Sequence, residues 1–282
     1  MNKKVVERII DRKVHDKLLS LDLHIDPGER ILITGADGSI GRRLTKRLES
    51  YDAITVLSTD IVGNHEYLDV TDFQNTFSVI NKFQPTIIVN IAGAKHAPLG
   101  EREIWKTLSI NTIGTMNLID ASPANCKLIL TSTCKANNPE VVYGASKLIA
   151  EKMALSSGGS VARFFNVVET VGNVFEIWND VPKSDAIKVA MDCERHFISV
   201  EESVGLIIYT FSSDSGRYMV NSPEKRSMVD IAEAIHPERE KIYMKPRIGD
   251  RVVELFKSTS ETEIIEHLNG SILQLKSIHD SE

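Results

Sequence analysis

Apolar runs with strand character alternate with segments of helical periodicity over the first 165 residues. The first run ends at Gly35, after which Ile40, Leu44 and Leu48 recur at the spacing of one helix face. The runs that predict strands occupy residues 30–34, 54–57, 86–91, 127–131 and 161–165. The segments between them predict helices at residues 71–82, 101–121 and 143–155. Strands that alternate with helices form a parallel sheet with right-handed crossovers and helices on both faces, so the expected fold class is α/β.

The regular alternation ends after Asn166. Beyond it the pattern predicts a helix, a short apolar run and two small helices, at residues 200–211, 218–220, 228–235 and 262–268.

This change of pattern predicts two units in the chain. We expect a first domain at residues 1–165 and a smaller lobe built mainly from residues 166–282, with residues 196–221 returning to the sheet. Residues 3–20 carry apolar positions at helical spacing. They predict an amphipathic helix that lies against the core or against a neighbouring subunit.

Composition and charge exclude several classes of protein. The 282 residues are 42% apolar and 26% charged, which is the balance of an ordinary globular protein. The net charge is -6 without any strongly basic run, so we expect no nucleic-acid partner. The longest stretch without a charged residue, residues 107–119, is too short and too polar for a membrane span.

The N-terminal residues and the cysteines indicate a cytoplasmic protein. Residues 1–13 are charged and lack the apolar core of a signal peptide. The three cysteines (Cys126, Cys134 and Cys193) have neither a paired nor a metal-ligand spacing, so we expect no disulfide framework and no metal site.

A glycine turn connects the first strand to the first helix of the pattern. Gly35, Gly38 and Gly41 are spaced by three residues, which lets the backbone approach a pyrophosphate at the N-terminus of a helix. Asp60, at the end of the second strand, is placed to accept hydrogen bonds from both hydroxyls of an adenosine ribose. This arrangement indicates a Rossmann-type, doubly wound dinucleotide-binding sheet and favours NAD, with NADP left open. The alternatives are a turn that only permits tight packing and a surface aspartate at position 60.

A tyrosine and a lysine at helical spacing suggest proton-transfer chemistry. Tyr143 and Lys147 are four residues apart, so they lie on one helix face, where an ammonium group favours the phenolate. Such a phenolate can take a proton from an alcohol. Ser132 and Thr133, at the end of the preceding strand, could hydrogen-bond the same oxygen. The alternative is a core tyrosine with a surface lysine.

The chain resembles the extended short-chain dehydrogenase/reductases, and within them the inverting UDP-N-acetylglucosamine 4,6-dehydratases of polysaccharide biosynthesis. The resemblance runs almost from end to end and rests on eight segments. These segments are residues 9–12 (IIDR), 35–41 (GADGSIG), 92–98 (AGAKHAP), 111–115 (NTIGT), 132–139 (STCKANNP), 163–167 (RFFNV), 195–198 (RHFI) and 247–251 (RIGDR). Two of these segments are specific to this branch of the family. They are residues 92–98, which resemble its "KHVP" loop, and residues 132–139, which resemble its "STDKAxNP" loop.

The resemblance implies a dehydration at C4, C5 and C6 of a sugar. Tyr143 would take the 4-hydroxyl proton while hydride passes to the nicotinamide, Lys135 would remove the C5 proton, and an acid would protonate the departing 6-hydroxyl. In the family that acid is an aspartate, and here the position is Cys134. An unperturbed thiol is mostly protonated at neutral pH, so it could supply the proton. It is also a weak hydrogen-bond donor, and a small filler at this position would leave an epimerase or a reductase.

The family pattern also implies the residues that contact each ligand. The expected catalytic group is Tyr143, Lys147, Lys135, Cys134 and Thr133. The expected cofactor contacts are Gly35, Asp37, Gly38, Ser39, Ile40, Gly41, Asp60, Asp69, Val70, Ala92, Gly93, Ala94, Lys95, Asn111, Ser132, Tyr143 and Lys147. The expected contacts of the UDP-sugar substrate, assigned mainly to the smaller lobe, are Lys95, His96, Thr133, Asn166, Arg195 and Arg247.

Plainer roles remain open for several of these residues. Asp69 could be a simple turn residue, Asn166 a turn cap, His96 a structural hydrogen-bonding residue, and Arg195 or Arg247 a surface arginine. For the whole protein, the alternatives are a UDP-sugar 4-epimerase or reductase, and a redox-sensing module that binds the dinucleotide without turnover. The apolar positions of the N-terminal segment and of residues 101–121 and 143–155 predict a homodimer or a larger homo-oligomer.

Overall fold

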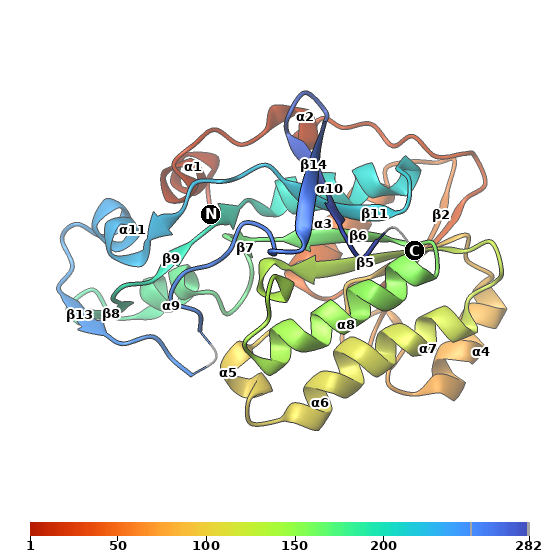
Figure 1. Ribbon diagram of the computed structural model, residues 1–282, viewed down its shortest axis with the longest axis horizontal. Coiled ribbons are helices and arrows are strands. Elements are labelled where there is room, and N and C mark those ends of the chain that lie inside the picture. The colour runs from red at the N-terminus through yellow and green to blue at the C-terminus, as the bar shows by residue number, and fades with distance from the viewer. Residues whose placement is uncertain (249, 281–282) are drawn as a thin grey trace.

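A nine-stranded sheet forms the centre of the computed structural model, which describes residues 1–248 and 250–280 (Figure 1). Its strands are β1 (Arg30–Thr34), β2 (Thr55–Asp60), β3 (Glu66–Tyr67), β4 (Ile87–Asn90), β5 (Lys127–Thr133), β6 (Ser160–Phe164), β11 (Gly216–Val220), β14 (Glu261–His267) and β15 (Ile272–Ser277). They are ordered β14-β15-β11-β6-β5-β4-β1-β2-β3. All pairs from β11 to β3 are parallel, and β15 and β14 add an antiparallel edge. The expected strands of the first 165 residues and the α/β fold are confirmed.

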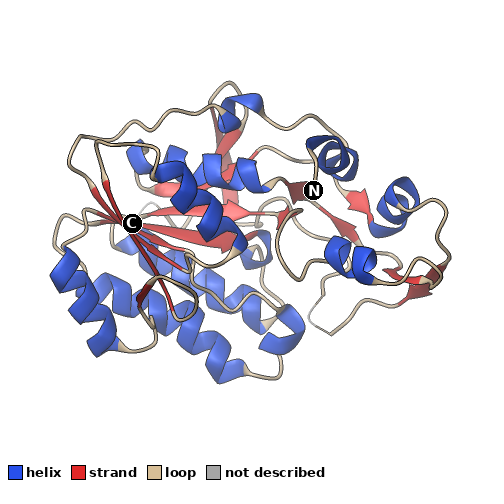
Figure 2. Cartoon of the chain, turned by 180° about the vertical axis from the view of Figure 1, so that it is seen from behind, coloured by secondary structure: helices blue, strands red, loops and turns tan. Residues whose placement is uncertain are grey.

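Helices cover both faces of this sheet (Figures 1 and 2). The helices around it are α3 (Ser39–Leu48), α4 (Phe73–Phe83), α5 (Ala97–Gly100), α6 (Ile104–Leu108), α7 (Gly114–Ala121), α8 (Val142–Ser156) and α10 (Val200–Ser212). On one face, Leu44 of α3 and Leu206 of α10 share a core with Ile31. On the other face, Leu118 of α7 and Ala150 of α8 share a second core with Leu32, Leu128 and Leu130. Successive side chains of a strand point to opposite faces, so in β1 Ile31 packs into the first core and Leu32 into the second.

The smaller lobe has a core of its own at one end of the sheet (Figure 1). Its elements are α1 (Lys3–Ile10), α9 (Val174–Asp180), β8 (Ile187–Ala190), β9 (Glu194–Arg195), β12 (Arg226–Ser227), α11 (Met228–Ile235) and β13 (Lys241–Met244), with the short pair β7 (Asn166–Val167) and β10 (Phe197–Ile198) leading into it. Phe175, Trp178 and Ile231 are buried there. The N-terminal α1 packs Val6 and Ile9 into the same core, whereas α10 and β11 belong to the main sheet layer.

The expected single helix over residues 3–20 is wrong. The chain forms α1 and then α2 (Asp16–Leu19), because Asp11 adopts a left-handed conformation with φ 57° and ends the first helix. The following Arg12 pairs with the buried Glu202 of α10, with 2.7 Å between Nη1 and Oε1. The two halves of the segment therefore pack on different elements, α1 on α11 and α2 on α10.

The expected helix at residues 262–268 is also wrong, because this segment is the edge strand β14. Leu268, Asn269 and Gly270 all have positive φ, at 50°, 54° and 80°. A turn with this geometry reverses the chain into β15, and an Asn-Gly pair favours it. The spacing of Ile264, Ile265 and Leu268 imitated a helix face, but the turn chemistry decides the structure.

The expected long helix at residues 101–121 is interrupted. It forms α6 and α7, joined by a π-helical turn at Ser109–Ile113. Within this turn the Asn111 side chain accepts a hydrogen bond from Ala94 N at 2.8 Å, and the Thr115 hydroxyl donates to the Asn111 carbonyl at 2.8 Å. Such turns occur often at functional sites.

Candidate active site

The glycine turn lies at the topological switch point of the sheet. From β1 the chain adds β2 and β3 on one side, and then crosses over to add β4 and β5 on the other. Gly35 has φ 69°, and a Cβ at this position would lie 2.7 Å from Ala92 N, so only glycine fits. Gly38 is the N-cap of α3, and Gly41 is buried within that helix. Ser39 and Ile40 form its first turn. The turn follows the carboxyl end of β1 and opens α3, so the first N–H groups of that helix lie at the sheet edge where a pyrophosphate can bind.

Asp60 connects the end of β2 to the glycine turn. Its Oδ2 accepts a hydrogen bond from Asp37 N at 2.9 Å, and its Oδ1 accepts one from Ile61 N at 2.7 Å. The Asp37 carboxylate pairs with Arg42 at 3.0 Å, and this partner lowers the pKa of Asp37. Asp60 is therefore placed beside the turn, at the position where the sequence predicts a ribose contact.

Asp69 and Val70 lie in the loop before α4. The Asp69 carboxylate accepts hydrogen bonds from the Thr71 N–H at 2.9 Å and from the Thr71 hydroxyl at 2.8 Å, so it organises its own turn. Val70 is buried against Gly114, where an added Cβ would lie 2.6 Å from Val70 Cγ2.

The loop of residues 92–95 is held by the π-helical turn at Ser109–Ile113, which is itself bonded to α8. Asn111 exchanges hydrogen bonds with the backbone of Ala94 and donates to Ser146 Oγ of α8 at 2.9 Å. A Cβ on Gly93 would lie 3.9 Å from Lys147 Nζ, so this lysine reaches the same loop. Ala92 follows β4 directly.

The backbone of Val171 contacts both Lys95 and Ser39, so it connects the loop of residues 92–95 to the start of α3. Lys95 Nζ donates to the Val171 carbonyl at 2.8 Å, and Val171 N donates to Ser39 Oγ at 3.0 Å. Burial lowers the pKa of Lys95.

Tyr143 and Lys147 lie in the first turns of α8, as the sequence predicts. Burial raises the pKa of Tyr143, while the Lys135 ammonium and the Thr133 hydroxyl oppose that rise. Burial lowers the pKa of Lys147 to about 8, although Glu151 on the same helix opposes the shift. The cation that acts on the phenol in this structure is thus Lys135.

Residues 132–135 form the end of β5 and the start of the 3-10 turn η2 (Cys134–Ala136). Ser132, Thr133 and Cys134 are all buried. Burial raises the pKa of Cys134 to about 12, with a further contribution from the Glu254 carboxylate, so the thiol is protonated at neutral pH. A Cβ on Gly144 would overlap the Lys135 carbonyl oxygen, which shows how closely this turn packs against the start of α8.

Glu254, which no sequence motif reveals, is 1% exposed and contacts three of the expected site residues, Lys135, Asn166 and Arg195. Its carboxylate lies 2.9 Å from Lys135 Nζ and accepts a hydrogen bond from Asn166 Nδ2 at 2.7 Å. It lies in an irregular segment with no periodic pattern. The signal that could have found it is its place three residues after the 247–251 motif.

The two expected phosphate-binding arginines have different environments. Arg195 is buried and donates to the carbonyls of Glu194 and Val252 at 3.0 and 3.1 Å. Arg247 is exposed and pairs with Asp250 at 2.9 Å. Residue 249 of the 247–251 motif lies outside the described residues.

His96 lies near the cations of Lys95 and Arg247. Burial lowers the pKa of His96, and the two cations lower it further. The structure thus gathers Lys95, His96 and Arg247 as one basic group.

The site as a whole fits a nicotinamide dinucleotide and a sugar. The glycine cradle, Asp60 and the 92–95 loop provide groups for the dinucleotide, and Tyr143, Lys135 and Cys134 provide exchangeable protons. Residues 1–248 and 250–280 contain no cluster of His, Cys, Asp or Glu that could hold a metal ion. Among these same residues, no helix is both long enough and apolar enough to cross a membrane.

Comparison with known proteins places this site in a family. The family model described as polysaccharide biosynthesis protein matches residues 63–269. The chain is 27% identical over 238 residues to the probable polysaccharide biosynthesis protein EpsC of Bacillus subtilis, covering 73% of this chain and 40% of that protein. The chain thus spans less than half the length of that relative. It is 26% identical over 267 residues to the UDP-N-acetylglucosamine 4,6-dehydratase (inverting) of Campylobacter jejuni, covering 84% of this chain and 79% of that protein.

Solved structures share the fold at lower sequence identity. The UDP-glucose 4-epimerase of Thermus thermophilus in complex with NAD has a TM-score of 0.70 and 20% identity, covering 80% of this chain and 89% of that chain. The dTDP-4-dehydrorhamnose reductase of Bacillus anthracis in complex with NADP has a TM-score of 0.71 and 21% identity, covering 82% of this chain and 90% of that chain. Because the family model covers most of the chain, the protein belongs to the polysaccharide biosynthesis protein family, and its relatives include nucleotide-sugar enzymes of the extended short-chain dehydrogenase/reductase type.

Proposed function

We propose that this chain is a nucleotide-sugar 4,6-dehydratase that acts on UDP-N-acetylglucosamine, with inversion at C5. The observation that carries the proposal is the packing of the η2 turn, which carries Cys134 and Lys135, against the start of α8, which carries Tyr143. A tyrosine with its helix lysine serves any alcohol oxidation, whereas the second lysine and the protonated thiol add the base and the acid that an elimination needs. The Campylobacter jejuni relative carries this same activity in its name.

A bound nicotinamide dinucleotide would take up hydride from C4 of the sugar and later return hydride at C6. Tyr143, as its phenolate, would accept the proton of the 4-hydroxyl, and the ketone formed as hydride leaves C4 makes the C5 hydrogen acidic. Lys135 rests as an ammonium ion, with its Nζ 2.9 Å from the Glu254 carboxylate, so it would pass one proton to that carboxylate before it takes the C5 proton. Cys134, whose pKa is raised to about 12, keeps its proton until the 6-hydroxyl leaves as water.

We propose NAD as the cofactor. The chain keeps a carboxylate, Asp60, at the end of β2 beside the glycine turn, where it accepts ribose hydroxyls and repels a 2′-phosphate. The structural relatives contain NAD or NADP, so either dinucleotide suits the fold.

The basic group of Lys95, His96 and Arg247 is our proposed site for the substrate diphosphate. Exposed arginine forks and lysine ammonium groups bind phosphate oxygens with charge-assisted hydrogen bonds. The exposed position of Arg247 leaves its guanidinium group able to turn from Asp250 toward a ligand.

A UDP-sugar 4-epimerase is the second candidate, and the thiol at position 134 favours it. An epimerase needs Tyr143 and Lys147 but no acid at the 6-hydroxyl, so a buried cysteine would be only a filler there. A module that binds the dinucleotide without turnover would give no role to the buried side chains of Tyr143, Lys135 and Cys134.

Incubation of the purified protein with UDP-N-acetylglucosamine, followed by mass analysis, tests the proposal. A product that has lost one water supports the dehydratase, unchanged mass with altered stereochemistry supports the epimerase, and unchanged substrate supports the module. The role of the thiol is tested separately with two variants of Cys134. Cys134→Ala should slow elimination after the first hydride transfer, so reduced nicotinamide and a 4-keto sugar with its 6-hydroxyl should accumulate. Cys134→Asp should keep activity, because aspartate can supply the same proton. Dehydration by Cys134→Ala at the parental rate would exclude the thiol as the acid.

A further inference from the structure

The Glu254 carboxylate is the meeting point of three segments around the site. Its Oε1 lies 2.9 Å from Lys135 Nζ and 3.6 Å from Arg195 Nε. Its Oε2 accepts hydrogen bonds from Asn166 Nδ2 at 2.7 Å and from His196 N at 3.3 Å. Both oxygens are thus occupied by donors that come from η2, β7 and the β9–β10 segment.

The charged groups around Glu254 and Lys135 act on one another's ionisation. Burial would raise the pKa of Glu254, but the cations of Lys135 and Arg195 bring it below its usual value. The Glu254 charge in turn acts on the His196 ring, whose pKa is lowered by burial. The carboxylate is therefore ionised throughout the neutral range.

The backbone of Lys135 packs against the start of α8 beside Tyr143, since a Cβ on Gly144 would overlap the Lys135 carbonyl oxygen. Burial would lower the pKa of Lys135, but Glu254 raises it above the usual value, with smaller contributions from Cys134 and Tyr143. The Lys135 charge lowers the pKa of Tyr143 against the effect of burial. Asn166 also accepts a hydrogen bond from Lys135 Nζ at 3.3 Å.

We propose that Glu254 is a positioning residue of the proposed reaction, on which this inference rests: it fixes Lys135 Nζ next to the Tyr143 phenol and keeps it an ammonium ion. A buried ammonium group without a counter-ion loses its proton readily, because the low-dielectric interior penalises the charge. With Glu254 in place, a cation faces the phenol when the 4-hydroxyl proton is taken. The phenolate is then the form that this cation stabilises.

A purely architectural role is the competing explanation, because Glu254 also ties its segment to Asn166 and to the His196 backbone. Such a role would lower activity by the same factor at every pH and would leave the ionisation of Tyr143 unchanged. The two explanations therefore differ in a titration, and this titration needs no substrate.

The experiment titrates the phenol of Tyr143 in the holoenzyme by absorbance at about 295 nm, after subtraction of a Tyr143→Phe reference in each background. Glu254→Gln, which keeps the shape and removes the charge, should raise the Tyr143 midpoint by roughly one pH unit. Glu254→Asp should restore most of the parental midpoint. In a Lys135→Met background, Glu254→Gln should add no further shift, since Glu254 acts through Lys135.

An unchanged Tyr143 midpoint in Glu254→Gln, or a shift that persists without Lys135, would overturn the inference. If Glu254→Gln fails to fold, as thermal melting would show, Lys135→Met alone must raise the midpoint by a similar amount, and no shift there also overturns it. When UDP-N-acetylglucosamine is added, the pH midpoint for formation of reduced nicotinamide should move with the Tyr143 midpoint. A Tyr143 shift in a protein that converts no UDP-sugar would contradict the proposed function and leave the coupling of Glu254 to Lys135 intact.

Discussion

Lys147 places an ammonium group in the interior beside the loop of residues 92–95. Its side chain is 5% exposed, and burial lowers its pKa from 10.5 to about 8. Below pH 8 the folded protein therefore carries the Lys147 charge in its interior, where it lowers stability. In the unfolded chain water solvates the same charge. Between these two values the unfolded state binds more protons than the folded state, so stability rises with pH.

We expect the free energy of unfolding of the parent protein to rise by about 3 kcal/mol relative to Lys147→Met between pH 8 and pH 10.5. Denaturant titrations of both proteins at several pH values measure this difference. The methionine variant is the control for every other group that titrates in this range. Parallel stability profiles for the two proteins would show that Lys147 is solvated in the folded state.

At the level of single residues, local sequence patterns predict where the residues of a motif lie in the elements. Tyr143 and Lys147 follow from helical spacing, and Gly35 from its place between a strand and a helix. Glu254 could not be found in this way, because its partner Lys135 is 119 residues away in the chain. Only the fold brings a long-range ion pair of this kind together.

Among the structural elements, α8 and three strands are joined by a network of buried charges. Glu151 of α8 pairs with Arg163 of β6 at 2.6 Å and with Arg217 of β11 at 3.0 Å. Arg163 also pairs with Glu261 of β14 at 2.6 Å. The network thus anchors the C-terminal hairpin to the helix that carries Tyr143.

Removal of Glu151 should strongly destabilise the fold. Glu151→Ala leaves two buried arginines with too few acceptors, and the expected loss is about 3–5 kcal/mol of unfolding free energy. Lys152→Ala is the matched control, because this neighbour on α8 is 46% exposed and lies 3.9 Å from Asp280. Thermal and denaturant unfolding of both variants measure the effect. Equal stability of the two variants would mean that the network is dispensable.

The errors in the predicted elements have identifiable physical causes. The parallel strands were predictable because both of their faces are buried, which requires continuous apolar runs such as residues 31–33. The hairpin was missed because two exposed or half-buried isoleucines, Ile264 and Ile265, stand next to each other on an edge strand. Edge strands carry mixed patterns, and here the Asn269-Gly270 turn was the stronger signal.

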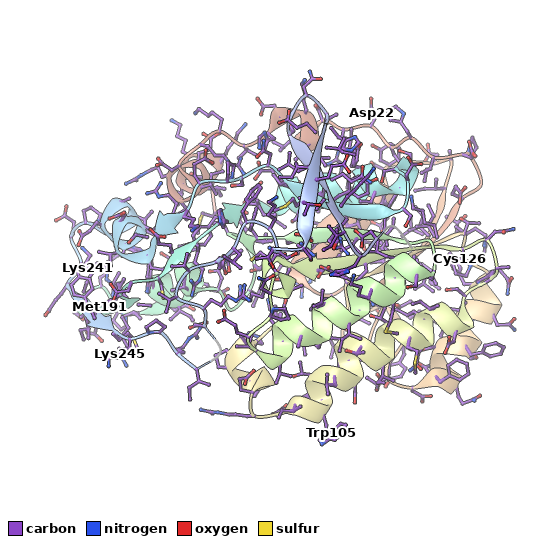
Figure 3. All side chains as sticks on the ribbon, viewed as in Figure 1. Asp22, Trp105, Cys126, Met191, Lys241 and Lys245 are labelled. Carbon is purple, nitrogen blue, oxygen red and sulfur yellow. The ribbon has the colours of Figure 1, made fainter. Side chains whose placement is uncertain are left out.

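The whole molecule presents an apolar surface on the helices α6, α7 and α8. Ile104 and Trp105 of α6, Met116 of α7 and Ile149 of α8 are exposed, with Trp105 at 82%. Figure 3 shows Trp105, near the start of α6, projecting away from the body of the molecule. Large apolar side chains that gather on one face of a protein indicate an interaction surface. We propose that a second copy of this chain covers this surface in a homodimer.

A pair of isoleucine substitutions tests the assembly. Ile149 of α8 is 47% exposed and Ile177 of α9, in the smaller lobe, is 49% exposed, so the two sites differ in location far more than in exposure. A two-fold interface would bury a glutamate at this position in both copies, and each would lose its hydration without a counter-charge, so Ile149→Glu should convert the dimer to a monomer. Ile177→Glu should leave the dimer intact. Light scattering at micromolar concentration measures both masses, and a parent protein that is already monomeric, or a dimer that survives Ile149→Glu, would contradict pairing through this surface.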